Sequence, residues 1–201
     1  VEYKRFLEKD FGWEDRFFHV GTSTIGEDWP YVLPGPSDEW GGTWATSGWR
    51  SHVLTILFEL ESRSNQGQWR LVLDVHDCAA DDPPLVKVTV NGRNWKFQLP
   101  AGTGRDLNPD SKAGAQYLMD IALPHDLIRQ GGNEINVTTL QGSWLVFDQV
   151  RLEGPDGSRL LESQDVVLRD VQTADYEMTV DGQRAQPLLV DVQHLSGAPE
   201  L

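Results

Sequence analysis

Residues Leu85–Leu99 read LVKVTVNGRNWKFQL, and this stretch decides the fold. Two runs in which apolar and polar residues alternate, Leu85–Val90 and Asn94–Leu99, flank the dipeptide Asn91-Gly92. Both central residues of a type I′ turn need a positive φ, so Asn-Gly between alternating runs is a strong signal for a β-hairpin. The segment therefore predicts two antiparallel strands joined by a tight turn, each with one face toward a core.

Further β-rich runs lie on both sides of this hairpin. They are Val53–Glu61, Trp69–Val75, Gln116–Leu123, Asn133–Thr139 and Trp144–Glu153. Helical patterns are confined to two short stretches, Val1–Lys9 and Pro124–Arg129. A series of strands separated by Gly- and Pro-rich turns favours a β-sandwich over a fold of alternating strands and helices. We predict an all-β chain, an antiparallel β-sandwich of the jelly-roll type with a short C-terminal strand extension.

A domain boundary is predicted at the turn cluster GPDGS, Gly154–Ser158, which follows the last strongly apolar run. We expect one jelly-roll domain over residues 1–155. Residues 156–201 contain no tryptophan, and Leu188, Val190 and Val192 alternate with other residues as in a strand. We interpret this tail as a linker and strands that lead into a following β domain, so we expect the chain to be a segment of a longer protein.

Charge and composition exclude several classes of function. The 201-residue chain has 17 basic and 31 acidic side chains and a net charge of −14, which argues against a nucleic-acid partner. No run approaches the roughly 18 apolar residues of a membrane-spanning helix, so no membrane partner is expected. The sequence opens on the charged stretch VEYKRFLEKD, so we expect the signal peptide of an exported parent to lie outside this segment. The lone Cys78 excludes an internal disulfide.

The long segment Gly21–Arg50 carries four of the eight tryptophans and is the first candidate for a binding site. A flat aromatic ring can stack on the apolar face of a sugar while nearby polar groups bind its hydroxyls. The expected platforms are Trp29, Tyr31, Trp40, Trp44 and Trp49; the expected polar groups are Glu27, Asp38, Arg50 and, from a second long loop, Arg105, Asp106 and Asn108. The alternative is that these rings form a local core that fixes the segment to the sandwich.

Catalytic patterns are absent from the sequence. Adjacent acidic residues on a strand point to opposite faces and do not form a pair of cooperating carboxylates. The five histidines lack zinc-site spacing, and no nucleophile or phosphate-binding motif is present. No cofactor is required by this reading. A structural Ca²⁺ held by carboxylates is expected, with Asp148, Glu14 and Asp15 as ligands.

Three segments carry a family resemblance: His19–Trp40 (HVGTSTIGEDWPYVLPGPSDEW), Val88–Pro100 (VTVNGRNWKFQLP) and Leu123–Glu153, which ends in GSWLVFDQVRLE. Together they resemble the carbohydrate-binding-like third domain of family 4 polysaccharide lyases, the rhamnogalacturonan lyase type. The resemblance covers roughly Phe17–Glu153 and implies a galactose-binding-like jelly roll. It also implies that catalytic residues lie in a separate domain, so no lyase activity is expected of this chain.

The sequence therefore predicts a non-catalytic carbohydrate-binding module of an exported bacterial polysaccharide-degrading protein. Its partners would be a plant-type polysaccharide or oligosaccharide, pectin for example, and the neighbouring domains of the parent chain. Its location would be secreted, periplasmic or on the cell surface. The alternatives are a purely structural jelly roll that braces the catalytic domain of a lyase or glycosidase, and an enzyme domain that acts alone. Rings that face solvent around a groove would favour binding, and a flat apolar patch would favour docking.

Overall fold

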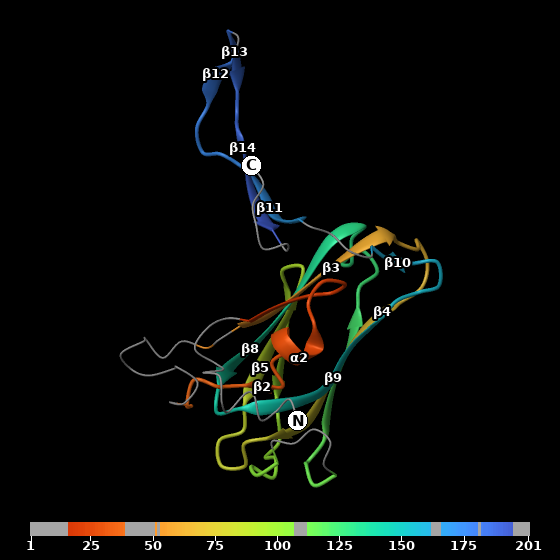
Figure 1. Cartoon of the computed structure of the whole chain (residues 1–201), viewed down its shortest axis with the longest axis vertical. Coiled ribbons are helices and arrows are strands. Elements are labelled where there is room, and N and C mark those ends of the chain that lie inside the picture. Colours follow the sequence, from red (N-terminus) through yellow and green to blue (C-terminus); the bar gives the residue numbers. More distant parts are fainter. Residues whose placement is uncertain are drawn as a thin grey trace.

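A computed structural model describes residues 16–38, 51, 53–106, 112–161, 166–180 and 182–194 of the chain. Two β-sheets pack face to face and form a sandwich (Figure 1). This confirms the predicted all-β sandwich of the jelly-roll type. Within the described residues, no helix has both the length and the apolar character needed to cross a bilayer.

The first sheet contains β1 (Arg16–His19), β3 (Val53–Ser62), β8 (Gly131–Gln141), β5 (Leu85–Val90) and β6 (Arg93–Gln98) in that order, with β10 (Arg159–Leu160) paired to β3. Its strands pair in antiparallel fashion except for β1 and β3, which run parallel. A parallel pair needs a long crossover connection. The segment between Val20 and Val53 supplies that length and passes through β2 of the other sheet.

The second sheet contains β2 (Val32–Leu33), β9 (Leu145–Glu153), β4 (Trp69–Cys78) and β7 (Tyr117–Leu123) in that order. All of its pairs are antiparallel, and the β4–β9 register shifts near Val75. β4 ends at Cys78, close to the turn between β8 and β9, because Cys78 pairs with Leu145 at the start of β9. This places the ends of three strands at one edge of the sandwich.

The β5–β6 hairpin forms as the sequence predicts, with Val90 opposite Arg93. Asn91 and Gly92 have φ values of 45° and 87°, the left-handed conformation that a type I′ turn requires. The Asn91 amide also donates to the Leu127 carbonyl at 2.7 Å and to Asn133 Oδ1 at 2.8 Å. Asn91 therefore fixes the turn and also ties it to the start of β8.

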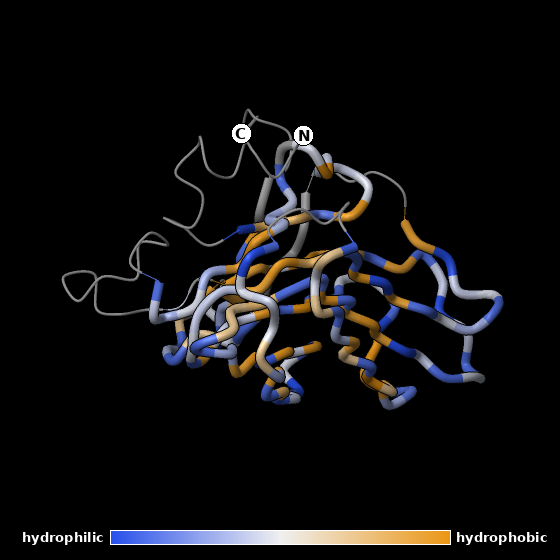
Figure 2. The backbone as a smooth tube through the Cα atoms, turned by 90° about the horizontal axis from the view of Figure 1, so that it is seen from below, coloured by the Kyte–Doolittle hydropathy of each residue, from blue (hydrophilic) through white to orange (hydrophobic). Residues whose placement is uncertain are grey.

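The core lies between the two sheets, where alternating side chains of each strand turn inward. Val86, Val88 and Val90 of β5 are 0% exposed, as strict alternation along this strand predicts. In Figure 2 hydrophobic positions recur along the strands of the sandwich, and several of the outer loops are hydrophilic. Trp69 is buried in this core, and the partly buried Trp95 packs against it.

Of the two predicted helices, the structure contradicts one and does not describe the other. Residues Pro124–Arg129 form a turn in place of a helix, with the Leu127 N–H donating to the Pro124 carbonyl at 3.1 Å. Six residues between two strands are too few to offset the unfavourable nucleation of a helix. The segment Val1–Lys9 lies outside the described residues. A single turn of helix, α2 (Ile25–Asp28), forms elsewhere and was not predicted.

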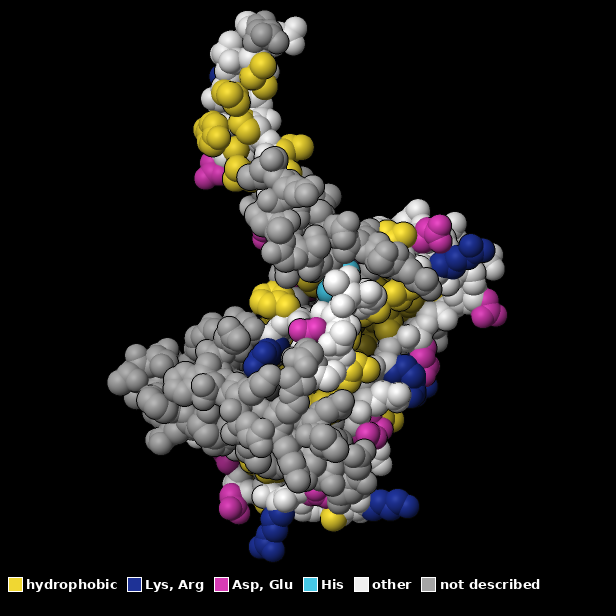
Figure 3. Space-filling model, in the orientation of Figure 1, with side chains coloured by type: hydrophobic (Ala, Val, Ile, Leu, Met, Phe, Trp, Pro, Cys, Tyr) yellow, Lys and Arg dark blue, Asp and Glu magenta, His cyan; other side chains and the backbone are white. Residues whose placement is uncertain are grey.

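A ribbon of four short strands follows β10 and projects from the sandwich (Figure 1). β11 (Val166–Thr173) pairs with β14 (Leu188–His194), and β12 (Met178–Val180) pairs with β13 (Gln183–Ala185). Figure 3 shows hydrophobic side chains along this ribbon. Its exposed large hydrophobic residues are Tyr176, Met178, Val180, Leu188, Leu189, Val190 and Val192.

Candidate functional site

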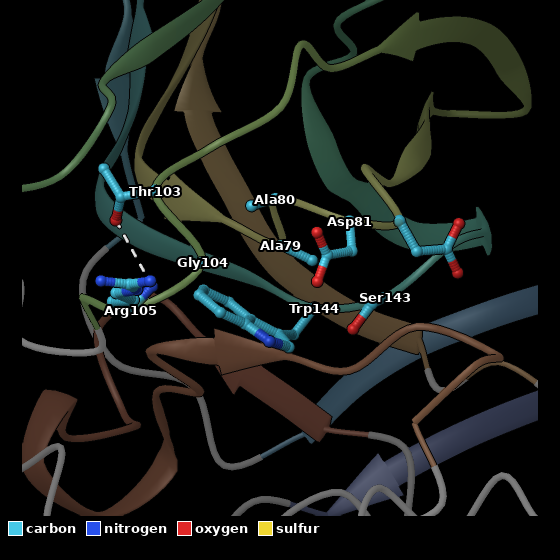
Figure 4. Close-up of a pocket in the computed structure, with 9 residues that line it drawn as sticks. Ala79, Ala80, Asp81, Thr103, Gly104, Arg105, Ser143 and Trp144 are labelled. Atoms are coloured by element: carbon cyan, nitrogen blue, oxygen red, sulfur yellow. Dashed lines mark hydrogen bonds between the residues drawn. The ribbon is translucent and has the colours of Figure 1, made fainter.

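A hollow of about 310 Å³ opens at the edge of the sandwich where β4 ends (Figure 4). Three connections supply its walls: the segment after β4, the loop after β6 and the turn between β8 and β9. The lining residues are Ala79, Ala80, Asp81, Asp82, Thr103, Gly104, Arg105, Ser143 and Trp144. Residues that lie far apart in the sequence therefore meet at one opening.

The buried carboxylate of Asp77 fixes the loop after β6. Its Oδ1 accepts the Thr103 N–H at 2.7 Å, and its Oδ2 accepts the Thr103 hydroxyl and the Asp106 N–H, the latter at 3.2 Å. Burial alone would raise the pKa of Asp77, but the hydrogen bonds, led by those from Thr103, hold it below its ordinary value. Asp77 is 0% exposed, so it shapes the hollow from beneath and does not face it.

Glycine allows this loop to lie directly on the end of β4. A Cβ on Gly102 would stand 2.1 Å from the Cys78 carbonyl oxygen and 2.5 Å from Asp77 Oδ1. Gly104 has a φ of 68°, and its N–H donates to the same Cys78 carbonyl at 3.1 Å. A side chain at Gly102 would thus separate the loop from the strand that positions it.

Asp106 points toward the interior of the loop. Its Oδ2 lies 3.2 Å from Nε2 of His76, and the two side chains are 12% and 9% exposed. Gly114 closes over this pair, since a Cβ there would stand 2.7 Å from His76 Nε2. Asp106 was expected to bind sugar hydroxyls, whereas the structure places it in a contact that holds the loop.

The opposite wall depends on Asp38, another buried carboxylate. Its Oδ2 accepts the Gly35 N–H at 2.8 Å, and its Oδ1 accepts the hydroxyl of Ser143. The Ser143 N–H in turn donates to the carbonyl of Asp82 at 2.9 Å. Asp38 is 6% exposed, so this predicted sugar-binding group instead fixes the turn that carries Trp144.

Trp144 supplies the aromatic surface of the hollow among the described lining residues. Its ring is half-buried and packs against Val32 and Val146, and its carbonyl accepts the Ala79 N–H at 3.1 Å. In Figure 4 the side chains of Arg105 and Asp81 lie on opposite sides of this ring. The hollow thus combines a fixed ring with a guanidinium on one side and carboxylates on the other.

Other predicted platform residues lie elsewhere. The half-buried Trp29 ring packs edge-to-face on Phe18, with centroids 5.3 Å apart, and tilted on Phe147 at 5.9 Å. Trp29 and the half-buried Tyr31 do not line the hollow. Glu27 belongs to α2, but its side chain is not among the described ones. The remaining predicted residues that lie outside the described chain are Trp40, Trp44, Trp49, Arg50 and Asn108.

Of the predicted polar groups, Arg105 lines the hollow. The sequence reasoning missed Trp144, Asp81, Asp82 and Ser143. The available signal was local: QGSW, Gln141–Trp144, places a tryptophan in a turn between two strands, where a ring is more accessible than within a strand.

The predicted calcium ligands are not brought together by the described residues. Asp148 is exposed on β9, and Glu14 and Asp15 lie outside the described chain. Within the described residues, no group of three or more His, Cys, Asp or Glu side chains is arranged to hold a metal ion. The structural calcium ion stays a prediction.

Comparison with known proteins identifies one family. The family model described as "CBM-like: Polysaccharide lyase family 4, domain III" matches residues 6–152. Comparison with curated proteins gives no significant match.

Two solved structures show weak similarity. A family GH115 4-O-methyl-α-glucuronidase with specificity for decorated arabinogalactans is 12% identical, over 52% of this chain and 13% of its own, with a TM-score of 0.35. The CBM35 of Abf62 from Cellvibrio japonicus is 18% identical, over 52% of this chain and 71% of its own, with a TM-score of 0.30. This chain thus spans a small part of the glucuronidase.

Proposed function

Because this chain belongs to the family of carbohydrate-binding-module-like third domains of family 4 polysaccharide lyases, we propose that its hollow binds a sugar residue of a polysaccharide without transforming it. The observation that carries this proposal is the placement of Trp144 between Arg105 and Asp81 (Figure 4). A pyranose ring presents C–H groups to an aromatic face and hydroxyls at its rim. Trp144 would stack on the ring, while Arg105 would donate to hydroxyl oxygens and Asp81 would accept from hydroxyl groups.

The size and rigidity of the hollow support this assignment. A volume of about 310 Å³ lies at the lower end of ligand sites, which suits one or two sugar rings. Two buried carboxylates, Asp77 and Asp38, hold the opposing walls, so little ordering is needed when a ligand binds. A single stack with a few hydrogen bonds gives a weak site, with a Kd between about 1 μM and 1 mM. The parent protein would gain retention from several such sites.

The wider setting belongs to the same proposal. The parent would be an exported bacterial polysaccharide-degrading protein, and its ligand a plant-type polysaccharide, for example the neutral galactan or arabinan of pectin. The family description supports this setting because it names the domain as one part of a polysaccharide lyase. Catalysis would reside in another domain of the parent.

The test is a titration of the 201-residue chain with galactan, arabinan and rhamnogalacturonan oligosaccharides, followed by calorimetry. Wild type should bind at least one of them saturably. Trp144→Ala should weaken that binding about fivefold, since a lost aromatic stack is worth on the order of 1 kcal/mol. Trp95→Ala is the matched control, because this ring packs against the core away from the hollow and should keep the affinity.

Two outcomes would contradict the proposal. One is the absence of saturable binding by wild type to every oligosaccharide. The other is unchanged affinity in a Trp144→Ala protein. Trp144→Leu, which keeps an apolar side chain on Val32 and Val146 but has no aromatic ring, separates lost stacking from lost folding if the alanine variant unfolds.

A second candidate is the purely structural module, and the exposed ribbon favours it. Leu188 is 62% exposed and Leu189 51%, and an exposed apolar surface of this kind commonly marks a protein contact. In this reading the ribbon docks on a neighbouring domain and the hollow has no ligand. The oligosaccharide titration distinguishes the two candidates, because a purely structural module binds none of the sugars.

A further inference from the structure

The hollow presents hydrogen-bond acceptors more than donors. The Thr103 hydroxyl donates to Asp77 and the Ser143 hydroxyl donates to Asp38, so both hydroxyl hydrogens are directed inward. The exposed carboxylates of Asp81 and Asp82 remain at the opening. A carboxylate accepts hydrogen bonds and donates none, and its bonds to hydroxyl groups are strengthened by its charge.

The net charge of the side chains around the opening is negative, which disfavours the binding of an anion. Asp81 and Asp82 contribute two negative charges and Arg105 one positive charge. One oxygen of Asp82 already accepts the Ser37 hydroxyl at 2.7 Å, but its charge remains. The whole chain carries a net charge of −14, and this field repels anionic ligands most strongly at low ionic strength.

We infer that the hollow selects uncharged sugars, such as neutral hexose or pentose residues, and discriminates against uronic acids. The inference rests on the proposed sugar site and names the class of sugar that the site takes. A neutral sugar offers hydroxyl hydrogens to both carboxylates. A uronate replaces one hydroxymethyl group by a carboxylate, which lacks that hydrogen and meets like charges.

The experiment compares sugars that differ mainly in charge. One pair is tetragalacturonate and its methyl ester, and the other is methyl β-glucuronide and methyl β-glucoside. Affinities of the full chain for each probe are measured at 20 mM and 200 mM NaCl. The uncharged member of a pair should bind about fivefold tighter at low salt, and the ratio should fall at high salt because exposed charges are screened.

Two variants with the same change in net charge locate the source of the selectivity. Asp81→Asn removes a carboxylate at the hollow and should reduce the low-salt ratio to about twofold. Asp120→Asn removes one on the outer face of β7, where it pairs with Arg70, and should leave the ratio unchanged. An equal effect of both variants would assign the selectivity to the net charge and overturn a role for Asp81.

The outcomes separate this inference from the proposed function. Tighter or equal binding of the acidic member of either pair would overturn the selectivity while the sugar site stands. Absence of binding for all four probes and for the galactan, arabinan and rhamnogalacturonan oligosaccharides would overturn the sugar site, and the inference with it.

Discussion

The hollow and the ribbon differ in the surface that they expose and in how that surface is held. The hollow exposes polar groups on loops, and the ribbon exposes apolar groups on paired strands. Around the hollow, buried carboxylates such as Asp77 hold loops without regular structure, and the lining is mostly polar, with Trp144 as its aromatic member. Along the ribbon, backbone pairing joins β11 to β14, and the exposed side chains among the described residues include several valines and leucines. A fixed polar opening suits a small hydroxylated ligand, whereas an apolar ribbon suits a protein surface.

Of the substitutions that test this difference, replacing Asp77 by alanine should lower the free energy of unfolding the most. It would leave the N–H groups of Thr103 and Asp106 buried without their acceptor, at about 1–3 kcal/mol for each unsatisfied group. We expect the free energy of unfolding to fall by roughly 3 kcal/mol, measured by urea denaturation. Asp120→Ala, at an exposed site, should hardly move the midpoint. Equal midpoints for Asp77→Ala and wild type would mean that the loop is held by other contacts.

Gly102→Ala should have a smaller but clear effect on the same loop. The added methyl group would stand 2.1 Å from the Cys78 carbonyl oxygen, so the loop must shift, at about 1–3 kcal/mol. The change is read as a lower melting temperature and weaker sugar binding. Gly92 has a positive φ but open space around its Cβ position, so a variant there tests turn strain without a clash. A fully stable Gly102→Ala protein with normal binding would refute the close packing of the loop.

Acid should destabilise the loop that Asp77 holds beside the hollow. The pKa of Asp77 is lowered in the folded state, so its contribution to stability is fully present above its unfolded pKa of about 3.9 and is lost as the pH falls through the folded value. Urea unfolding of wild type from pH 7 to pH 2 should therefore show a decline below about pH 4. In Asp77→Asn that part of the decline should disappear. An identical pH profile for the two proteins would contradict the assignment.

Polar substitution on the ribbon should have the smallest effect on folding. Leu188 is 62% exposed, so Leu188→Ser should change the free energy of unfolding by less than about 0.5 kcal/mol. The same change should reduce the binding of a fluorescent dye specific for apolar surface. A large loss of stability would show that the ribbon packs more tightly than its exposure indicates.

Local signals in the sequence predict the strands well. Asn91-Gly92 identifies its hairpin because the turn imposes a backbone requirement that few residue pairs meet. The alternation in β5 gives the buried face directly, since successive strand residues point to opposite sides. The parallel β1–β3 pair was missed because pairing direction depends on how the intervening chain crosses the sandwich.

The site was harder to predict because its contacts join distant residues. Asp77 and Thr103 are 26 positions apart, and Asp38 and Ser143 are 105 positions apart. No short sequence motif predicts hydrogen bonds between residues this far apart in the chain. Tryptophan density directed attention to Gly21–Arg50, yet Trp29 packs on Phe18 and Phe147, and the ring at the hollow comes from an isolated position, Trp144.

Cys78 makes the opening of the loop measurable without any added label. Its thiol donates to the Pro100 carbonyl at 3.3 Å, and burial raises its pKa to about 11. A thiol reagent at neutral pH should therefore react mainly with molecules in which the loop has moved away from β4. The alkylation rate then measures how often this local opening occurs. If the hollow binds a sugar as proposed, saturation with that sugar should slow the alkylation of Cys78 in proportion to occupancy, so this single thiol reports on how often the loop opens.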